Sequence, residues 1–431
     1  MRMLSPALFP ALACAMVCAG CGAAPAPEAP SKVVRFATFN AALNRNSAGE
    51  LGRDLATGDH PQAQAVAEIV QRARPDVLLL QEFDRDPEAL SQFIEDYLKV
   101  SQGGAEAIDY PHVYQPEVNT GVPSGFDLDG NGKAGDPGDS KGFGKFPGQY
   151  GFAILSRWPI ATDRIRSYQN LPWSTLPDAL RPSKADGTGS WYTDEAWAAL
   201  PLSSKNHVDV PVRTPQGVIH VIAAHPTPPV FDGPEDRNGR RNFDELRLVA
   251  AMLAPAAPAW LVDDTGGRRG LPSMSAFVIM GDMNADPRDG DSVKGAIAQV
   301  LEHPRVNPAA ASGVHTPQSA GGTANAEKRP ADRPPLKGDP AHHTAGWGLR
   351  VDYALPSANL EVKASGVFWP TAAEPHGDLV QPKMVDGKRR DPSSDHRLVW
   401  VDVSSPELHL DVREDLRRAR PLESRRDDRH P

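Results

Sequence analysis

Short apolar runs that end in polar side chains recur along the chain. In the segment FVIMGDMNADP, residues 277–287, four apolar residues are followed by Asp282, Asn284 and Asp286 at alternate positions. A continuous apolar run of this length predicts a buried strand. We expect Gly281 to end that strand. Asp282 and Asn284, two residues apart, should then share a side and reach one ligand together.

The same pattern predicts most of the other elements. Strands are expected over 33–43, 76–84, 150–160, 206–214, 217–229, 349–357 and 396–404. Helical spacing of apolar residues predicts helices over 61–76, 88–99 and 242–253. The Pro- and Gly-rich stretches 102–149 and 307–346 are expected to be irregular. Strands dominate without regular β-α-β units, which favours two sheets flanked by helices over a simple parallel sheet.

The beginning of the chain has the pattern of a targeting segment. Arg2 precedes an apolar stretch that is too short and too interrupted by proline to span a membrane. The motif AGC ending at Cys21 resembles a bacterial lipoprotein cleavage site, which makes Cys21 the expected lipidated residue. A plain secretory signal is the alternative. The predicted division is a signal peptide over 1–21, a linker over 22–32, one domain over 33–405 and a charged, partly disordered tail over 406–431.

Composition limits the partners. The formal net charge of -9 argues against a broad basic surface for gripping nucleic acid. All three cysteines lie in the targeting segment, so the mature chain can form no internal disulfide. No other stretch is apolar for the length that a bilayer demands, so a lipid anchor is the only membrane attachment expected. The sequence indicates no partner protein.

Polar side chains that suit one kind of chemistry collect at the predicted strand ends. They are Asn40, Glu82, His225, Asp282, Asn284, Asp352, Asp395 and His396. Carboxylate and amide oxygens are hard ligands that suit Mg²⁺, Mn²⁺ or Ca²⁺. Histidines with neighbouring carboxylates suit proton transfer. Delivered to one edge by rigid strands, such groups predict metal-assisted hydrolysis of a phosphoester. Asp286 precedes a proline and is expected to shape a turn.

Seven motifs in this order resemble the endonuclease/exonuclease/phosphatase superfamily, whose members are similar to deoxyribonuclease I. They are TFN (38–40), LLLQE (78–82), GFAILSR (151–157), IAAHP (222–226), MGDMNADP (280–287), RVDYAL (350–355) and SSDH (393–396). The resemblance implies a four-layer α/β/β/α sandwich of two packed, mainly antiparallel sheets flanked by helices. It also implies a site at one end of the two sheets.

The resemblance implies a role for each strand-end residue. The implied catalytic residues are His225, Asp282, Asn284, Asp352 and His396. The implied metal ligands are Asn40, Glu82 and Asp395, for Mg²⁺ or Mn²⁺. In this scheme Asp282 and Asn284 position the attacking water and the phosphate, and Asp352 orients His396. A carboxylate on one ring nitrogen fixes the tautomer and raises the basicity of the other nitrogen.

Cations near the predicted site are candidates for holding the substrate phosphate. They are Lys205, Arg237, Arg240 and Arg241. The alternatives are a solvated turn for Lys205 and a charged loop that caps a helix for the arginines. In the related deoxyribonucleases a carboxylate just ahead of the central strand supports the first histidine. The corresponding segment FPGQY (146–150) has no acid, so the sequence offers His225 no such support.

The segment DLDGNGKAGDPGDS (127–140) resembles the start of a calcium loop. Asp127, Asp129 and Asn131 have the expected spacing, while Gly138 stands where the last acidic ligand is usual, with Asp139 beside it. A structural Ca²⁺ and a simple Asp/Gly turn are both compatible with this pattern.

Together these patterns predict an exported, metal-dependent phosphoesterase. The substrate stays open between a nucleic acid, a lipid or sugar phosphodiester, and a small phosphomonoester. For a lipid or sugar diester, Trp173, Trp191 and Trp197 are candidates for the lip of a pocket. A catalytically silent binding module on the same fold is the alternative from another class.

Overall fold

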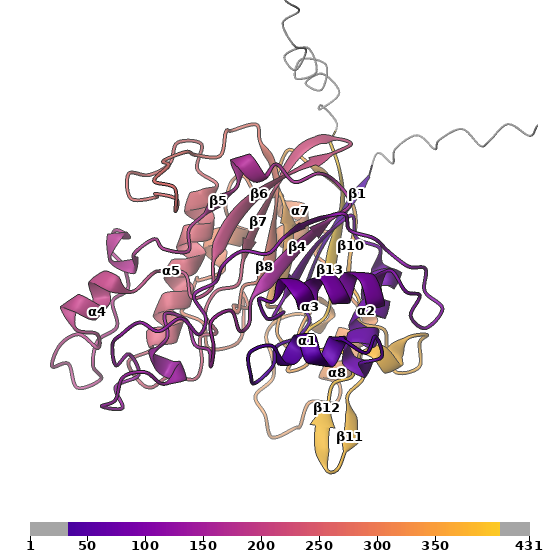
Figure 1. Cartoon of the computed structure of the whole chain (residues 1–431), viewed down its shortest axis with the longest axis horizontal. Helices are drawn as coiled ribbons and strands as arrows, with labels where there is room; N and C mark the ends of the chain where they lie inside the picture. Colours follow the sequence, from indigo (N-terminus) through magenta and orange to yellow (C-terminus); the bar gives the residue numbers. More distant parts are fainter. Residues whose placement is uncertain (1–32, 406–431) are drawn as a thin grey trace, which may run out of the picture. The chain divides into compact units, whose positions relative to one another are not determined.

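The computed structural model describes residues 33–405, whose strands form two large sheets and one separate two-stranded hairpin (Figure 1). The first sheet has the order β10-β13-β1-β2-β4-β3 and the second the order β5-β6-β7-β8-β9. The strands of the first are β1 Val34–Asn40, β2 Val77–Gln81, β3 His112–Tyr114, β4 Phe152–Ser156, β10 Glu361–Val367 and β13 Val399–Ser404. Those of the second are β5 Arg166–Ser167, β6 His207–Thr214, β7 Gly217–Ala224, β8 Ala276–Asp282 and β9 Asp352–Pro356. The predicted signal peptide, linker and tail lie outside the described residues.

Both sheets are mainly antiparallel, as predicted. The parallel pairs are β1 with β2 in the first sheet and β7 with β8 in the second. The other neighbouring strands in these sheets pair antiparallel. Each sheet thus has one parallel pair at its centre, and the carboxyl ends of the two strands of each pair meet at one edge.

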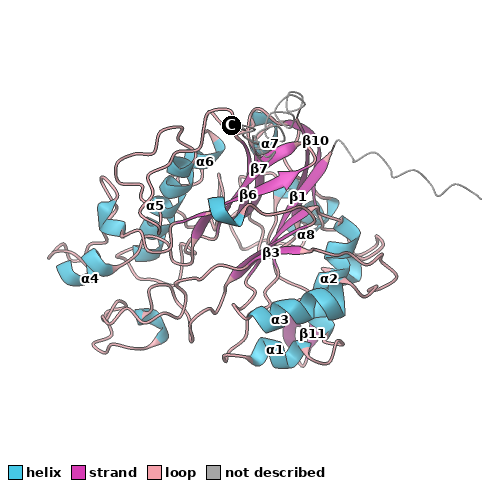
Figure 2. Ribbon diagram, turned by 45° about the horizontal axis from the view of Figure 1, so that its top comes forward, coloured by secondary structure: helices cyan, strands magenta, loops and turns pink. Residues whose placement is uncertain are grey.

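Helices cover the outer faces of the sheets and complete the four predicted layers (Figures 1 and 2). Helices α1 Glu50–Leu55, α2 Pro61–Ala73, α3 Pro87–Gln92 and the π-helix η1 Phe93–Leu98 lie beside the first sheet. Helices α5 Arg237–Met252 and α6 Ala298–Leu301 lie beside the second. The remaining helices are α4 Asp194–Ala199, α7 Pro308–Ala311 and α8 Ala320–Ala326, with short 3₁₀ turns η2 Pro137–Asp139, η3 Thr162–Arg164, η4 Trp173–Thr175, η5 Pro340–His342 and η6 Gly377–Leu379.

The alternation of side chains along the central strands divides the core into two clusters. On β8, Val278 and Met280 join the cluster shared with the first sheet, whereas Phe277 and Ile279 join the cluster that contains Leu246 of α5. Successive residues of a strand point to opposite faces, so both faces of β8 are buried. This explains its continuous apolar sequence.

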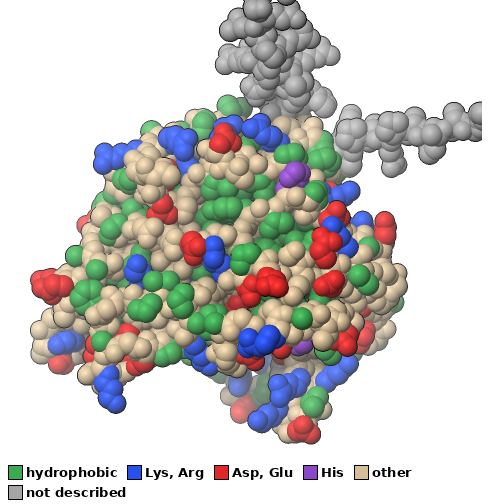
Figure 3. Space-filling model, viewed as in Figure 1, with side chains coloured by type: hydrophobic (Ala, Val, Ile, Leu, Met, Phe, Trp, Pro, Cys, Tyr) green, Lys and Arg blue, Asp and Glu red, His purple; other side chains and the backbone are tan. Residues whose placement is uncertain are grey.

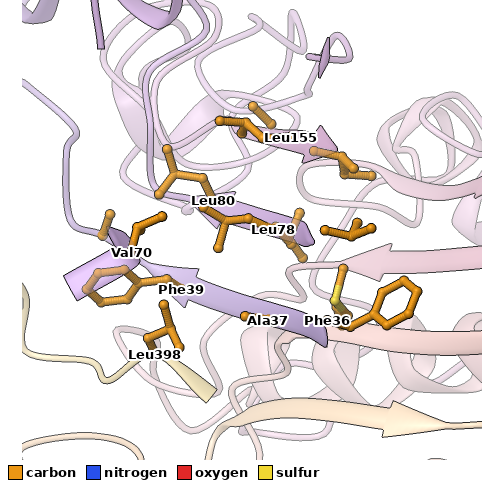
Figure 4. Close-up of a cluster of buried hydrophobic side chains, with 14 of the residues drawn as sticks. Phe36, Ala37, Phe39, Val70, Leu78, Leu80, Leu155 and Leu398 are labelled. Carbon is orange, nitrogen blue, oxygen red and sulfur yellow. The ribbon is translucent and has the colours of Figure 1, made fainter. Parts of the chain in front are cut away.

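The first sheet is buried in the same way. Figure 4 shows Phe39 of β1 and Leu80 of β2 near Val70 of α2. All three side chains are fully buried. The spacing of Val66, Ile69 and Val70 gives α2 the apolar face that covers these strands.

Several predicted boundaries shift, each for a local reason. Helix α5 starts at Arg237 rather than 242. The backbone N–H groups of a first helical turn have no partner within the helix, and Asp232 satisfies one of them by accepting a hydrogen bond from Asn238 N (2.6 Å). Strand β8 runs through Gly281 to Asp282, so the expectation that Gly281 ends it was wrong. Strand β10 was not predicted, because it is a sheet-edge strand with exposed positions.

Gly281 permits close contact between β7 and β8. A Cβ atom at this position would lie 1.9 Å from the carbonyl oxygen of Ala224. Only glycine allows the end of β8 to approach the end of β7 this closely. The approach brings Asp282 beside the residue that follows Ala224, which is His225.

The surface mixes charges of both signs. On the face in Figure 3, Lys and Arg side chains lie among Asp and Glu side chains. The hairpin of β11 Lys383–Val385 and β12 Lys388–Arg390 projects from the rest of the domain (Figure 1). Within residues 33–405, no helix has the length and apolar character needed to cross a membrane.

Candidate active site

The predicted site residues meet at the edge where the central parallel strands end. Asn40 closes β1, Glu82 follows β2, His225 follows β7 and Asp282 closes β8. Strand β9 runs antiparallel to β8, and its first residue, Asp352, pairs directly with Asp282. Topology alone therefore gathers residues that lie far apart in the sequence.

A chain of polar contacts links the two sheets at this edge. Asn40 Nδ2 donates to Glu82 Oε1 and to Asp282 Oδ2, each at 3.1 Å. Asn44 Nδ2 holds the other oxygen of Glu82 at 2.8 Å. The backbone of Glu82 has a φ of 51°, which is uncommon for a residue with a side chain. Such backbone strain clusters at functional sites.

Two histidines converge on the same carboxylate oxygen. His225 Nε2 lies 3.5 Å and His396 Nε2 lies 3.6 Å from Asp282 Oδ2. His396 Nδ1 lies 2.9 Å from Asp352 Oδ2, so Asp352 holds the proton on that nitrogen. This is the orienting arrangement that the resemblance implied for Asp352 and His396.

The surroundings of the two histidines shift their pKa values in opposite directions. Burial lowers the pKa of His225 well below its usual value, and the Lys205 charge adds to this effect. Its Nδ1 has no hydrogen-bond partner among the described residues, in line with the missing acid in the segment 146–150. For His396, burial also disfavours the charged form, but the charges of Asp352 and Asp282 outweigh it and raise the pKa. These shifts favour the positively charged imidazolium for His396 and the neutral imidazole, with a single ring proton, for His225.

The loop after β8 fixes the remaining residues of this motif. Asn284 N donates to Asp282 Oδ1 (2.9 Å), and Asn284 Nδ2 donates to the carbonyl of Pro226 (3.1 Å). Asp286 accepts hydrogen bonds from Arg288 N and Asp289 N, which confirms that it shapes a turn.

Burial raises the pKa of Asp282.

Asp395 lies next to His396 in a half-buried position. Its carbonyl accepts a hydrogen bond from Gly346 N at 2.8 Å, and its charge contributes to the raised pKa of His396. Asp282, Asp352 and His396 also place one ligand atom each within 4.8 Å of one another. The edge thus offers two groups of side chains that could ligate a metal ion, one around Glu82 and one around Asp282.

A pocket of about 730 Å³ opens from this edge. Glu82, Lys205 and His225 line it at the site. Lys205 is buried, and its ammonium group has no hydrogen bond or ion pair with a described residue. Burial lowers the pKa of Lys205, while Glu82, Glu245 and Asp282 oppose that effect. A buried amine without a partner favours an anionic ligand.

The three candidate arginines differ in their contacts. Arg241 lines the pocket and donates to the carbonyls of Leu202, Pro201 and Lys141, so it holds neighbouring loops together. Arg237 also lines the pocket and pairs with Glu235. Arg240 is half-buried, and its Nε has no partner among the described residues.

The predicted tryptophan lip is wrong for Trp173. Its side chain is fully buried, and Nε1 donates to Asp244 at 2.7 Å. Its ring packs against Trp197 with centroids 4.9 Å apart. Trp191 is half-buried, with Nε1 bonded to the Leu128 carbonyl (2.9 Å). Trp173 of η4, Trp197 of α4 and Tyr192 thus form an aromatic cluster.

Sequence reasoning missed two residues at the site. The Gln81 amide is fully buried, and Oε1 accepts from Thr38 Oγ and from Asp282 N, each at 2.9 Å. Its Nε2 donates to the Ala224 carbonyl (3.3 Å), so one side chain joins β1, β2, β7 and β8. A polar residue inside the apolar run LLLQE was the available signal. The second residue, Trp347, packs edge-on against His396 with ring centroids 4.9 Å apart, and its loop sequence gave no signal.

The Asp/Gly segment forms a compact acidic loop. Asp127, Asp129 and Asp139 each place one oxygen within 4.8 Å of the others, so Asp139 joins the two aspartates that the spacing suggested. Asn131 Nδ2 instead donates to Asp129 Oδ2 at 3.2 Å. Asp139 is buried and accepts hydrogen bonds from Leu128 N and Gly135 N. Calcium binding by this loop stays a prediction.

Comparisons with known proteins agree with this geometry. The model of the Endonuclease/Exonuclease/phosphatase family matches residues 37–396. The chain belongs to this family. No curated protein sequence matches it.

The chain is also similar to several solved structures. An endonuclease/exonuclease/phosphatase from Beutenbergia cavernae is 16% identical, with a TM-score of 0.43, covering 86% of this chain and 72% of its own. Sphingomyelinase C from Streptomyces griseocarneus is 17% identical, with a TM-score of 0.43 and coverage of 86% and 99%. A beta toxin variant from Staphylococcus aureus with bound magnesium ions is 12% identical, with a TM-score of 0.41 and coverage of 86% and 99%.

The contacts of Gln81 predict that it supports both stability and the site. Gln81→Leu leaves the Asp282 N–H and the Ala224 carbonyl buried without partners, which costs about 2–4 kcal/mol of unfolding free energy. We expect urea unfolding to show this loss and hydrolysis at saturating substrate to fall as Asp282 shifts. Gln71→Leu is the matched control, because Gln71 is an equally buried amide that bonds Leu98 O and Val100 O away from the site. It should lose comparable stability and keep kcat. Equal kcat in both folded variants would refute the role given to Gln81.

The acidic loop predicts stabilisation by calcium. If the loop binds Ca²⁺, calcium at 100 times its Kd raises the unfolding free energy by about 2.7 kcal/mol. Thermal unfolding with added CaCl₂ measures the shift, and Asp129→Ala should abolish it. Asp186→Ala removes an exposed acid from another turn and should keep it. A shift that is absent in the wild type, or that survives in Asp129→Ala, would rule out this loop as the site.

Proposed function

We propose that the chain is a divalent-metal-dependent phosphoesterase that hydrolyses a phosphodiester or phosphomonoester with water. The observation that carries this proposal is the convergence of Asn40, Glu82, Asp282 and two histidines from both sheets on one buried edge. An acceptor for a water proton, a protonated imidazole and a buried cation lie together there. Each of these groups can promote phosphoester hydrolysis, by taking up a proton, by giving one or by offsetting negative charge.

Glu82 and Asn40 fit a hard cation such as Mg²⁺ or Mn²⁺. Each oxygen of Glu82 receives one amide hydrogen bond, which leaves lone pairs on both oxygens for a ligand. Asp395 completes the proposed set from the half-buried position beside His396. Since His396 and Asp352 bond to each other, we place the cation at Glu82 rather than between them. A bound Mg²⁺ would supply positive charge to the phosphate oxygens.

The side chains divide the reaction between them. Asp282 accepts a proton from the attacking water, whose oxygen forms the new bond to phosphorus. Asn284 orients the water and the phosphate. The bond from phosphorus to the leaving oxygen breaks, and His396 donates its Nε2 proton to that oxygen. His396 has this role because its pKa is raised, whereas burial keeps His225 neutral.

His225 and Lys205 bind the phosphate in this scheme. Asp282 faces Nε2 of His225, which favours the tautomer with the proton on Nε2. That N–H can donate to a non-bridging oxygen. Lys205 presents a buried positive charge to the same region of the pocket. Arg237, Arg240 and Arg241 are proposed as weaker outer contacts, because two of them are already bonded to protein groups.

If the proposed activity is correct, hydrolysis should be lost when the metal is removed or when His396 is replaced. We expect bis(p-nitrophenyl) phosphate to be cleaved with Mg²⁺, and EDTA to abolish cleavage reversibly. His396→Ala should lower kcat by about 10³-fold, the range of a lost proton donor. Glu82→Gln should weaken Mg²⁺ binding measured by calorimetry.

His112→Ala is the matched control, because His112 lies on β3 and is not part of the site. It should keep the wild-type rate. Plasmid DNA and p-nitrophenyl phosphate in parallel separate the nuclease and monoesterase alternatives. If the wild type cleaves no ester and His396→Ala behaves identically, the catalytically silent binding module is favoured.

We also propose that the chain is exported and anchored to a membrane through a lipid on Cys21. The support is the motif AGC at 19–21 after an apolar stretch, and these residues lie outside the described part. In a bacterial host that processes lipoproteins, labelled palmitate should be incorporated by the wild type and by Cys18→Ser, but not by Cys21→Ser. Incorporation in Cys21→Ser would place the lipid elsewhere. Secretion without any label would favour a plain signal peptide.

A further inference from the structure

The pocket at the candidate site has an apolar mouth that is open to water. Glu82, Lys205 and His225 line the pocket at the site. The lining also includes the apolar or aromatic residues Leu128, Phe143, Pro137, Tyr192, Pro228 and Phe231, of which Phe143 and Phe231 are exposed. A volume of about 730 Å³ is within the range of sites for small organic molecules. The phosphate position is therefore continuous with space for a larger organic group.

Two phenylalanines at this mouth face water. Phe143 is 60% exposed and Phe231 is 87% exposed, and both line the same pocket. They belong to separate loops, one before β4 and one before α5. Leaving a phenylalanine in water instead of burying it forgoes about 1.5–3 kcal/mol. Two such residues at one pocket point to an apolar ligand that covers them.

The loop that carries Phe231 is held so that the ring stays outside. Phe231 has a φ of 65°, which is a genuine outlier for a bulky residue. Asp232 bonds Asn238 N, and Asn238 Nδ2 bonds the Val230 carbonyl at 2.7 Å. These bonds on both sides of Phe231 tie its loop to the first turn of α5.

The loop that carries Phe143 is anchored just as firmly. A Cβ atom on Gly142 would lie 1.9 Å from the Ser204 carbonyl, so the chain passes directly over the residue that precedes Lys205. Arg241 bonds the Lys141 carbonyl at 2.7 Å. The position of Phe143 is thus tied to the same segment that presents the buried cation.

The charges that line the pocket have both signs. Asp129 and Asp136 line it together with Arg237 and Arg241, but Arg237 pairs with Glu235 and Arg241 bonds backbone carbonyls. Among the described lining residues, Lys205 is the cation without such a partner, which favours one phosphate position over a row of them. A polynucleotide needs cations along its backbone path instead.

We propose that this pocket binds the apolar organic group of a phosphodiester, an alkyl chain that passes between Phe143 and Phe231 while its phosphate lies by Lys205. The inference rests on the proposed function and names the substrate class for the same site. The apolar group supplies binding energy, and Lys205, His225 and Glu82 hold the charged end. An alkyl chain rather than a flat ring is favoured because the apolar lining also includes the aliphatic side chains of Leu128, Pro137 and Pro228.

A series of p-nitrophenyl alkyl phosphodiesters from methyl to hexyl tests the proposal. All are used as soluble monomers with Mg²⁺, and cleavage is followed by absorbance and by mass spectrometry of the phosphate products, so that either broken ester bond is counted. We expect the wild-type kcat/KM to rise about two- to fourfold for each added methylene that becomes buried. The double variant Phe143→Ser, Phe231→Ser should lose most of this rise with chain length, measured as the ratio of its kcat/KM on the hexyl ester to that on the methyl ester.

Val314→Ser is the matched control, because Val314 is 88% exposed and does not line the pocket. It should keep the wild-type dependence on chain length. A rate independent of chain length in the wild type, or an unchanged dependence in the double variant, overturns the proposal. A p-nitrophenyl ester of thymidine 5′-phosphate that is preferred over the hexyl ester also overturns it, in favour of a stacked base.

Two further arms separate the sources of an apolar chain and the failure of the proposed function. Phospholipid vesicles cleaved faster than the monomeric hexyl ester would identify the substrate as a lipid in a surface, and the reverse order would identify a soluble ester; both support an apolar chain. If no ester is cleaved, including the methyl ester, the proposed function fails as well. Cleavage of all esters at one rate rejects the apolar pocket alone.

Discussion

The side chain of Gln81 holds the two sheets together at the edge where the candidate active site lies. A buried amide must satisfy its donor and acceptor inside the protein, because leaving them unpaired costs more than the hydrogen bonds gain. Gln81 meets this requirement by bonding Thr38 in its own sheet and Ala224 and Asp282 in the other. The apolar packing of two sheets is not directional by itself. The amide supplies the direction, since it fixes how far β8 extends past β2 and so where the Asp282 carboxylate lies.

From that fixed point the site acquires its asymmetry. Asp282 lies almost equally far from His225 and His396, yet the two rings have different charges. The difference comes from what lies behind each ring. Asp352 lies behind His396, whereas Nδ1 of His225 has no partner among the described residues. A neighbouring buried Lys205 adds positive charge on the side of His225. Asp282 thus lies between a charged His396, which can donate a proton, and a neutral His225, which can donate a hydrogen bond. Different surroundings that push the pKa values of neighbouring groups apart are typical of acid–base sites.

The sequence predicted the parts of this arrangement that depend on strand ends. An apolar run followed by Asp282, or by Glu82, places a polar side chain at a sheet edge whatever the rest of the fold does. Apolar runs and the order of the motifs therefore sufficed for the two sheets, for β8 and for the edge at which His396 meets Asp352. They did not suffice for the edge strand β10, whose exposed positions carry little apolar signal. Gln81 was missed for a related reason: its role depends on Ala224 and Asp282, and no local pattern records contacts to residues in the other sheet.

The walls of the pocket lie further beyond what sequence can specify. A tryptophan is a sensible candidate for a substrate lip, but Trp173 has an indole N–H that finds Asp244, and the bond draws the ring into the interior. Phenylalanine has no polar atom to satisfy and is kept outside only by backbone constraints. For Phe231 the constraint is a left-handed conformation held by Asp232 and Asn238, and for Phe143 it is the contact of Gly142 with the Ser204 carbonyl. In the Pro- and Gly-rich loops of this protein, hydrogen bonds and close backbone contacts keep the two phenylalanine rings exposed. Their position in the pocket that Lys205 also lines, rather than the composition of the loops, is the reason for proposing them as a binding surface.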